Sequence, residues 1–484
     1  MILRAPPARL VRGAAVFAVL LLAAPGSRGD AIVAGTMPED YMPGLMVIVR
    51  TALTHGPSMI SQQISVATGE ANLLGADSQL YPQLSAGGTV GASNESVGES
   101  GQAGTVGSKS TGTVKSTTYN VNLYQPIWQW GAIWNQTRIS KLQLLISQKS
   151  YADAYRTFLL QLRDSYLSLV RQKFSLNNAR LNLTLAQTAL ANQQAMVKAG
   201  IASTGSVIGP ELLEADTHLA FDRAQQDYFH AKRLLALMAG MPDIPEDSIP
   251  TDIPKVAYSP ETADMVLAEC LRDGAKSTFQ AQSYEMNIRQ QELTRRINMV
   301  AQLPKISGSA SYGLSNSTSI SLTPTPAGGV PVPAAIAQEA VTSTTYGLNA
   351  SWDIFDGWRS LAAIRTAKLQ KRYYERSLQT YLDTTLEAAQ DDRRQLDYAA
   401  RAMALAERRR DLANAAFQQA TNDYKLGVAT QASVDNSRYN LQVSLYSQAA
   451  TRSDFLSRWS QFLSLTGADP ALGLLPAQYV RVHH

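Results

Sequence analysis

The chain alternates apolar and polar positions from Tyr346 to Ile354. Every second residue is aromatic or aliphatic, and the residues between them are Gly, Asn, Ser and Asp. This period of two predicts a β-strand with one apolar face. From Trp358 the sequence continues for roughly seventy residues without a proline and is rich in helix-forming residues, which predicts a long helix directly after the strand.

The same order of elements occurs earlier in the chain. An alternating segment that begins at Tyr119 is followed by an aromatic cluster, a glycine and a second long helical segment. We therefore predict an internally duplicated chain. Three landmarks recur at nearly one spacing: Pro82 and Pro304 (304 − 82 = 222), Gly131 and Gly357 (357 − 131 = 226), and Gly200 and Gly427 (427 − 200 = 227).

The periodicity and the punctuating Gly and Pro residues place the elements of two structural repeats, 31–300 and 301–484. In the first repeat we expect strands at about 83–98 and 117–128, long helices at about 131–199 and 211–240, a connector at about 241–260 and a helix at about 261–302. In the second repeat we expect strands at about 305–321 and 343–355, long helices at about 357–426 and 431–466, and a C-terminal tail.

Two features qualify the strands. The stretches 94–116 and 322–342, which join the strands of each pair, are rich in Gly, Ser, Thr, Pro and Val, so we expect flexible connectors there. Pro126 lies near the end of its strand, where a residue without a backbone N–H indicates a sheet edge or a bulge.

The long helices carry a heptad pattern. Apolar residues recur every seven positions from Leu162 to Val197, and again from Leu382 to Met403. This spacing predicts supercoiled packing against neighbouring helices. The second set of heptad positions, three residues before the first set, is occupied by Lys, Arg and Gln toward Gly200. We therefore expect the helices to face water on more than one side near that glycine.

Composition and charge exclude several classes of function. The net charge is +4, only 17% of residues are charged and no basic block is present, which argues against nucleic-acid binding. The single cysteine, Cys270, excludes an intrachain disulfide and a thiolate metal site, and the five histidines lack ligand spacing. No hydrolase, phosphate-loop or zinc-protease motif occurs, so we expect no enzyme, no cofactor and no metal.

The N-terminus is typical of an exported protein. Arginines precede an apolar run from Ala14 to Ala24, and small residues follow, so residues 1–30 are predicted to be a secretory signal peptide, with a retained membrane anchor as the alternative. No cysteine follows the run, so no lipid anchor is expected there. No later segment reaches eighteen consecutive apolar residues. If the exported chain enters a membrane, it must do so as a closed β-barrel, because lipid cannot satisfy open strand edges.

The predicted strands resemble those of an outer-membrane barrel. Ile306, Tyr312 and Leu314 share an apolar face, whereas the alternate positions are serines. A soluble sandwich shows the same alternation, but the aromatics at the strand-to-helix junctions favour a membrane interface. Four strands cannot close a barrel, so several copies would have to pool their edges. The predicted interface aromatics are Trp128, Trp130, Trp134, Trp352, Phe355 and Trp358.

At this point the residues resemble a known family, the TolC-like outer-membrane efflux proteins (outer membrane factors). The resemblance covers nearly the whole mature chain and rests on the duplicated Pro–strand, the strand–aromatic–Gly–helix junction, and "YKLGVAT" followed by "SVDNSRYNL". It implies a mixed α and β, mainly α, fold: a trimer whose chains each add four strands to one shared transmembrane β-barrel, continued by long α-helical coiled-coil hairpins. It also implies a place in the outer membrane of a Gram-negative bacterium, with the helices in the periplasm.

The resemblance further implies a function. The chain would be the outer-membrane channel of a tripartite efflux pump, passively conducting small toxic molecules or drugs and gated by opening of the hairpin tips. Its partners would be two further copies, outer-membrane lipid, a periplasmic adaptor and an inner-membrane pump. Two alternatives remain: the outer-membrane channel of a type I protein secretion system, and a soluble periplasmic coiled-coil adaptor. No sequence motif separates a drug channel from a protein channel, because both are passive conduits.

The resemblance assigns candidate residues to the two tips. Family members place a tyrosine before the second tip, which Tyr424 matches, and aspartates just after it, where this sequence has Ser433 and Asn436 with Asp435 between them. We therefore expect a weaker acidic ring and less block by multivalent cations; a charge near a helix N-terminus is the alternative role of Asp435. The candidate constriction residues are Tyr424, Ser433, Asp435, Asn436 and Ser206, and the candidate adaptor-docking residues are Lys198, Gly200, Ile201, Ala202, Ser203, Leu426, Gly427, Val428, Ala429 and Thr430.

The tips are expected to differ. Gly205, Gly209 and Pro210 follow the first tip, so its returning helix is predicted to start late or to be broken, whereas the second tip leads directly into a helical pattern. Both Gly200 and Gly427 suit a helix C-terminus with positive φ, a structural role that is compatible with either tip being a docking site.

Overall fold

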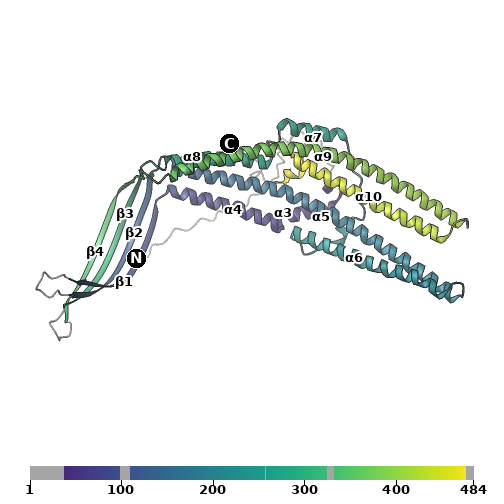
Figure 1. Cartoon of the computed structure of the whole chain (residues 1–484), viewed down its shortest axis with the longest axis horizontal. Coiled ribbons are helices and arrows are strands. Elements are labelled where there is room, and N and C mark those ends of the chain that lie inside the picture. The colour runs from purple at the N-terminus through teal and green to yellow at the C-terminus, as the bar shows by residue number, and fades with distance from the viewer. Residues whose placement is uncertain (1–36, 99–108, 257, 324–331, 476–484) are drawn as a thin grey trace, which may run out of the picture.

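The structure is a computed structural model that describes residues 37–98, 109–256, 258–323 and 332–475. The predicted signal peptide lies outside the described residues. The molecule is elongated: a four-stranded sheet stands at one end and two long helical hairpins at the other (Figure 1).

The sheet is antiparallel with the order β1-β2-β3-β4. Its register places apolar residues of neighbouring strands opposite one another, as in Leu84–Leu123 and Val121–Tyr312. Rows of apolar side chains therefore cross one face of the sheet, and Tyr346 and Leu348 on β4 are 82% and 75% exposed. No helix covers the sheet within the described residues (Figure 1). The strands are β1 (Gln83–Gly98), β2 (Lys109–Trp128), β3 (Lys305–Thr323) and β4 (Val332–Ser351).

Two strands differ from their predicted bounds. β2 begins at Lys109 rather than at 117, and β4 runs from Val332 to Ser351 rather than from 343 to 355. The described parts of the Gly-, Ser- and Thr-rich stretches that suggested flexible connectors are therefore strand, because small side chains do not prevent backbone pairing when a partner strand is present; residues 99–108 and 324–331 lie outside the described residues. β4 ends where its partner begins, since Ser351 pairs with Lys305, directly after Pro304. The predicted irregularity at Pro126 is confirmed by a register shift between Pro126 and Trp128.

Below the sheet, helices continue in the same order as the strands. α4 (Pro57–Asp77) leads into β1, β2 leads into α5 (Ala132–Lys198), α8 (Phe279–Val300) leads into β3, and β4 leads into α9 (Arg359–Lys425). α4 contacts α5, α5 contacts α8, and α8 contacts α9. The sheet and this upper helical layer thus form one continuous wall (Figure 1).

Farther from the sheet, α5 and α9 continue and two other helices return beside them. α6 (Ile208–Ala239) packs on α5, and α10 (Gln431–Thr466) packs on both α9 and α5. α6 begins at Ile208, three residues before the predicted 211, because its Pro210 lies in the first turn, where no backbone N–H is needed. The helix predicted at 261–302 is two helices, α7 (Pro260–Asp273) and α8, separated where Gly274 and Ala275 both have positive φ.

The main hydrophobic core lies at the waist of the molecule, where the chain ends and the connector meet the long helices. Leu162 and Tyr166 of α5 are fully buried there, together with Leu45 of α3 (Pro43–His55) and with Phe455 and Phe462 of α10. The heptad positions Leu162 and Leu169 are buried, whereas the later ones toward Gly200 are only partly buried, in line with the predicted narrowing of the apolar stripe. Among the described residues, no helix is both long and apolar enough to cross a membrane.

Candidate functional site

The first hairpin tip is a helix-ending turn built on Gly200. Its φ is +75°, and the Gly200 N–H donates to the Val197 carbonyl at 3.0 Å while the Ile201 N–H donates to the Met196 carbonyl at 2.9 Å. This pair of bonds is the Schellman motif, which satisfies carbonyls that the end of α5 would leave unpaired. Ile201 is left 78% exposed at the end of the molecule.

The second tip repeats this turn on Gly427. Its φ is +74°, the Gly427 N–H donates to the Tyr424 carbonyl at 3.0 Å, and the Val428 N–H donates to the Asp423 carbonyl at 2.8 Å. Leu426 and Val428 are 77% and 80% exposed. The two tips therefore share one backbone design and each presents large apolar side chains to water, at the same end of the molecule (Figure 1).

The exits from the two turns differ. After the second tip Thr430 caps α10, which begins at Gln431. After the first tip a 3-10 turn, η2 (Thr204–Val207), precedes α6, and the Ser206 hydroxyl both donates to the Ser203 carbonyl at 2.5 Å and accepts from Gln193 Nε2 at 2.7 Å. Nine residues (199–207) thus separate the helices of the first hairpin and five (426–430) those of the second.

The candidate constriction residues lie around these turns. Tyr424 is half exposed, and Ser433 and Asn436 are exposed on the first two turns of α10. Asp435 accepts from Gln431 Nε2 at 3.1 Å and lies 4.0 Å from Arg438, so its charge is partly matched within its own helix. Ser206 is on the other hairpin and is held by Gln193. The residues predicted as docking surface, including Lys198, Ala202, Ser203 and Ala429, all lie in or next to the two turns, and most of them are exposed.

The junction aromatics gather where the strands meet the long helices. Trp128 and Trp130 form an edge-to-face pair at 5.8 Å between ring centroids, and Phe355 and Trp358 form another at 5.7 Å. The indole N–H groups of Trp130 and Trp352 donate to the carbonyls of Pro304 and Gln302, at 2.8 and 2.9 Å. Both junctions are thereby joined by hydrogen bonds to the segment that precedes β3. All six predicted aromatics, Trp134 included, remain 43–71% exposed.

The backbone of the two junctions corrects one sequence alignment. Trp130 and Gly131 both have positive φ before α5, and Gly357 and Trp358 both have positive φ before α9. The structural equivalents are therefore 227 residues apart (358 − 131), and the glycines that sequence comparison paired at 226 occupy different positions. In each junction a tryptophan takes a backbone conformation that favours glycine, and the order of the two residues is reversed.

At the waist, one connector (241–259) lies against both hairpins. It contacts the first hairpin through Tyr166, whose hydroxyl donates to the Ser248 carbonyl at 2.6 Å, and through Lys173, whose Nζ donates to the Ile249 carbonyl at 2.6 Å. Lys232 of α6 pairs with Asp243 at 3.1 Å. These contacts were missed by sequence reasoning, because no periodicity links a Pro-rich connector to distant helices.

The same connector holds the second hairpin through ion pairs and through apolar packing, in which the Tyr258 ring lies edge-on to Phe455 of α10 at 5.3 Å between ring centroids. Lys255 lies 2.7 Å from Glu407 of α9, and Arg452 of α10 lies 3.4 Å from the same carboxylate and donates to the Ile253 carbonyl at 2.8 Å. Just beyond the connector, Arg393 of α9 pairs with Asp264 of α7 at 2.8 Å. The hydrogen bond from Lys255, together with Arg452, lowers the pKa of Glu407 below its ordinary value.

A buried triad fixes the first long helix to both ends of the described chain. The Arg163 side chain of α5 is fully buried; its Nε donates to Glu39 at 2.7 Å and its Nη1 donates to Asp469 at 2.5 Å. Glu39 belongs to α2 (Pro38–Tyr41), and Asp469 caps the 3-10 helix η4 (Pro470–Leu474). Burial raises the pKa of Glu39 in spite of the neighbouring Arg163. We call these three residues the terminal triad.

The described residues hold no cluster of His, Cys, Asp and Glu able to bind a metal. The arrangement around the tips offers exposed apolar side chains, helix ends and few charges, which suits contact with another protein rather than bond chemistry.

Comparison with known proteins shows a similarity to outer-membrane efflux proteins. A family model described as "Outer membrane efflux protein" matches residues 48–240. The search of curated protein sequences finds no match.

Solved structures match over most of the chain. The Campylobacter jejuni CmeC outer membrane channel has a TM-score of 0.65 at 15% identity, covering 92% of this chain and 90% of that one. The outer membrane protein VceC of Vibrio cholerae has a TM-score of 0.60 at 15% identity, covering 88% and 97%. The open state of the Neisseria gonorrhoeae MtrE outer membrane channel has a TM-score of 0.56 at 14% identity, covering 88% and 89%. At such identities the likeness concerns the fold.

Proposed function

We propose that this TolC-like outer-membrane efflux protein is the channel of a tripartite pump. In the proposal, three copies form one passage that conducts small toxic molecules or drugs passively from the periplasm to the exterior, and the hairpin tips form its gate. The family match over residues 48–240 and the shared fold support an outer-membrane efflux channel whose helical part lies in the periplasm.

One observation carries the proposal. The chain is a wall segment with two open edges: β1 and β4 each pair on one side only within the described sheet, and the helices below follow the same order. Unpaired strand edges cannot be satisfied in lipid, so a membrane-embedded sheet of this kind needs further copies to pair with. Three chains supply twelve strands, which is enough for a closed barrel.

The tips support the second part of the proposal. A passive conduit needs an end that can close, and the described helical hairpins end in two tight glycine turns at the same end of the molecule. Ile201, Leu426 and Val428 are exposed apolar residues. Such residues suit docking of a periplasmic adaptor, which would act together with an inner-membrane pump. The soluble-adaptor alternative predicted a compact segment between paired helices, whereas the described residues carry long strands with one exposed apolar face.

The test is deletion of the gene followed by complementation. If the proposal is correct, the deletion strain becomes sensitive to dyes and antibiotics, the wild-type gene restores resistance, and the purified protein conducts ions in planar bilayers. A gene that carries alanine at the apolar tip residues Ile201, Leu426 and Val428 should make protein that inserts and conducts but should not restore resistance. Loss of a secreted protein without any change in drug sensitivity would replace the proposal by the type I secretion alternative, and absence of conductance would overturn it.

A further inference from the structure

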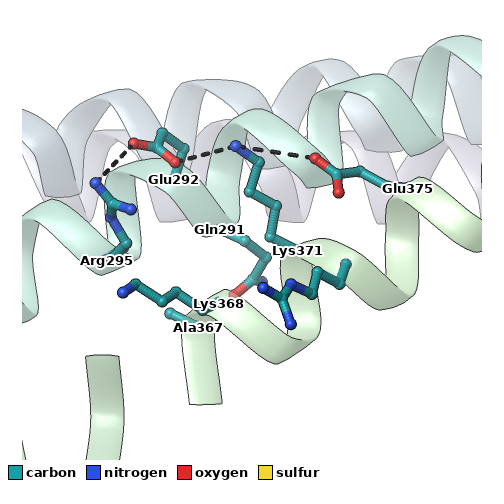
Figure 2. A pocket seen from close by; sticks show the side chains of 8 residues that line it. Gln291, Glu292, Arg295, Ala367, Lys368, Lys371 and Glu375 are labelled. Atoms are coloured by element: carbon teal, nitrogen blue, oxygen red, sulfur yellow. Dashed lines mark hydrogen bonds and ion pairs between the residues drawn. The ribbon is translucent and has the colours of Figure 1, made fainter. Parts of the chain in front are cut away.

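A groove between α8 and α9 carries more positive than negative charge. Its volume is about 270 Å³, and Figure 2 shows the side chains that line it. Four of them are basic and two are carboxylates, so two positive charges are left over. The lining residues are Gln291, Glu292 and Arg295 of α8 and Ala367, Lys368, Lys371, Arg372 and Glu375 of α9.

The two carboxylates of the groove are already paired. Lys371 Nζ lies 3.3 Å from Glu292 and 3.9 Å from Glu375, and the Arg295 guanidinium lies 3.6 Å from Glu292 (Figure 2). The hydrogen bond from Lys371, together with the charges of the nearby arginines, holds the pKa of Glu292 below its usual value. Glu292 is therefore ionised at neutral pH, and its charge is matched by Lys371 and Arg295.

Three basic side chains of the groove have unused hydrogen-bond donors. Lys368 and Arg372 are exposed and have no acidic partner within the described chain, and in Figure 2 Lys368 extends toward the Arg295 end of the groove, away from Glu375. Arg295 Nε is shielded from water and has no hydrogen-bond partner. A shielded N–H group costs free energy unless an acceptor reaches it. The groove thus offers donors that the described chain does not satisfy.

The first repeat contains the same seam between two helices, α4 and α5. The helices α5 and α9 begin 227 residues apart (359 − 132), and the strands after α4 and α8 begin 222 residues apart (305 − 83). By these spacings Gln291 corresponds to Gly69, and Lys371 corresponds to Leu144. A Cβ placed on Gly69 would lie only 3.2 Å from the Leu144 Cδ1, so these two positions face each other in the first repeat as they do in the second.

Three of the four basic residues of the groove replace leucines of the first repeat. Only Lys368 has a basic counterpart, Lys141. The first repeat therefore builds this part of the wall from apolar contacts, and packing of the two helices does not require the positive charge that the second repeat carries. The replaced positions are Arg295, Lys371 and Arg372, which correspond to Leu73, Leu144 and Leu145.

The unused donors suit a phosphate group. Guanidinium groups offer a planar set of N–H donors that matches phosphate oxygens, and a lysine adds a point charge. Inorganic phosphate or a phosphomonoester carries a charge of about −1.5 to −2 at pH 7 and at least three acceptor oxygens. Such a group would balance the two positive charges left over in the groove, whereas a carboxylate would balance only one of them.

We propose that the groove between α8 and α9 binds a phosphate group through Lys368 and Arg372, with Arg295 turning its free N–H toward the same oxygens. The group belongs either to a small phosphate in solution or to the phosphomonoester headgroup of a lipid. A headgroup is a possible source because Arg295 lies five residues before the end of α8 (300 − 295), about 8 Å from it along the helix, close to the junction aromatics. The groove lies within one chain, so the inference does not depend on the proposed passage.

Titration calorimetry with inorganic phosphate tests the site. The full chain is purified in a non-ionic detergent at low salt and without phosphate. Lys368→Gln with Arg372→Gln removes the two bases that have no acidic partner, so no ion pair of the chain is broken. Phosphate affinity should fall about tenfold or more, because charge-assisted hydrogen bonds are lost. Arg365→Gln with Arg376→Gln is the matched control: it removes the same charge from exposed positions of α9 outside the groove and should change the affinity little.

A second variant uses the residues of the first repeat. Lys371→Leu with Arg372→Leu gives the groove the leucines that pack at the equivalent positions of α5. This variant should keep the far-ultraviolet circular dichroism and the melting temperature of the wild-type protein and should lose phosphate binding. It keeps the test decisive if the glutamine variant folds poorly.

A lipid arm distinguishes the two sources of phosphate. The same proteins are placed in nanodiscs of phosphatidylcholine with or without phosphatidic acid, and native mass spectrometry counts the lipids that each protein retains. Binding of inorganic phosphate that the groove variants lose supports a soluble ligand. Retention of phosphatidic acid alone, again lost in the groove variants, supports a lipid headgroup.

Two results would overturn the inference. One is the absence of binding of both probes to the wild-type protein. The other is an equal loss of binding in the groove variants and in the Arg365→Gln with Arg376→Gln control, because the protein would then respond only to its net charge. Neither result depends on drug sensitivity, so a failure of the proposed function is recognised separately by the deletion strain.

Discussion

The two long helices α5 and α9 are equal in length and unequal in attachment. Each has 67 residues, begins after a residue with positive φ and ends in a Schellman turn. At the waist, however, α5 carries a fully buried arginine paired with two buried carboxylates, whereas Arg393 of α9 pairs with Asp264 and Asp397, whose side chains are 64% and 40% exposed. The ion pairs that hold α5 at the waist are therefore buried, whereas water reaches the carboxylates that pair with Arg393 of α9, although Phe455 and Phe462 of the second hairpin are buried in the same core.

This difference indicates which hairpin can move. Separating a buried ion pair exposes uncompensated charge in a region of low dielectric constant, whereas water replaces a partner at an exposed pair at little cost. In the proposed gate we therefore expect the α9–α10 hairpin to move and the α5–α6 hairpin to stay. Three measurements break or sharpen this comparison.

The largest effect is expected from the two waist arginines. Arg163→Met leaves Glu39 and Asp469 buried without their cation, so we expect a loss of about 3–5 kcal/mol in unfolding free energy. Arg393→Met leaves carboxylates that water can solvate, so we expect about 1 kcal/mol or less. Urea titration of the detergent-solubilised variants, followed by circular dichroism, measures both. Equal losses would remove the basis of the comparison.

The tip glycines come next. Gly200 and Gly427 have nearly the same φ, and no atom outside the turn lies within 4 Å of an added Cβ at either position. Backbone strain alone should therefore make a valine cost about 1–2 kcal/mol of stability at each tip. Resistance of the complemented deletion strain should nevertheless fall more with Gly427→Val than with Gly200→Val. Asn, which tolerates positive φ, is the control at both sites. An equal fall in resistance would mean that both tips move.

The smallest effect is a dependence on pH, and its sign differs between the hairpins. The pKa of Glu407 is lowered below its usual 4.5, so its pairing with Lys255 stabilises the fold fully above that pH and is lost as pH falls through the lowered value. The pKa of Glu39 is raised above 4.5, so the cost of burying its charge disappears as pH falls through the raised value. Acid should therefore loosen α9 and α10 at the waist and leave α5 firm.

Hydrogen exchange at a series of pH values from about 6.5 down to about 3, corrected for intrinsic rates, measures this difference, because Glu407 is protonated only well below its ordinary value. Faster exchange of α9 segments near Glu407 with unchanged exchange near Arg163 is the expected result. Glu407→Gln should give the acid behaviour at neutral pH. Faster exchange in both helices would contradict the assignment of the two attachments.

The sequence predicted those features that depend on neighbouring residues. The heptad leucines, the glycine turns and the alternating strands are local patterns, and the long helices lie within a few residues of their predicted bounds. The starts of β2 at Lys109 and of β4 at Val332 were predicted too late in the sequence. Gly, Ser and Thr are typical of loops, and the sequence alone does not reveal the partner strand that makes these residues pair. The positive φ of Trp358, next to that of Gly357, has no counterpart in any local sequence pattern.

The waist contacts could not be predicted in the same way. Arg163 lies on a helix whose pattern gives no reason for a buried charge, and its partners are at positions 39 and 469, near opposite ends of the chain. Only the folded arrangement brings them together. The predicted tip residues do gather at the end of the molecule, but whether Asp435 narrows a passage depends on copies that a single chain does not contain.

The unbroken length of α9 has a mechanical consequence. From Arg393 to its end at Lys425 it extends 32 residues (425 − 393), which is about 48 Å at 1.5 Å per residue. A bend of only about 10° at the waist would carry the far end through about 8 Å, by the same arithmetic. In the proposed gate, such a lever arm would convert a small movement at the waist into an aperture, with no need to unwind any helix.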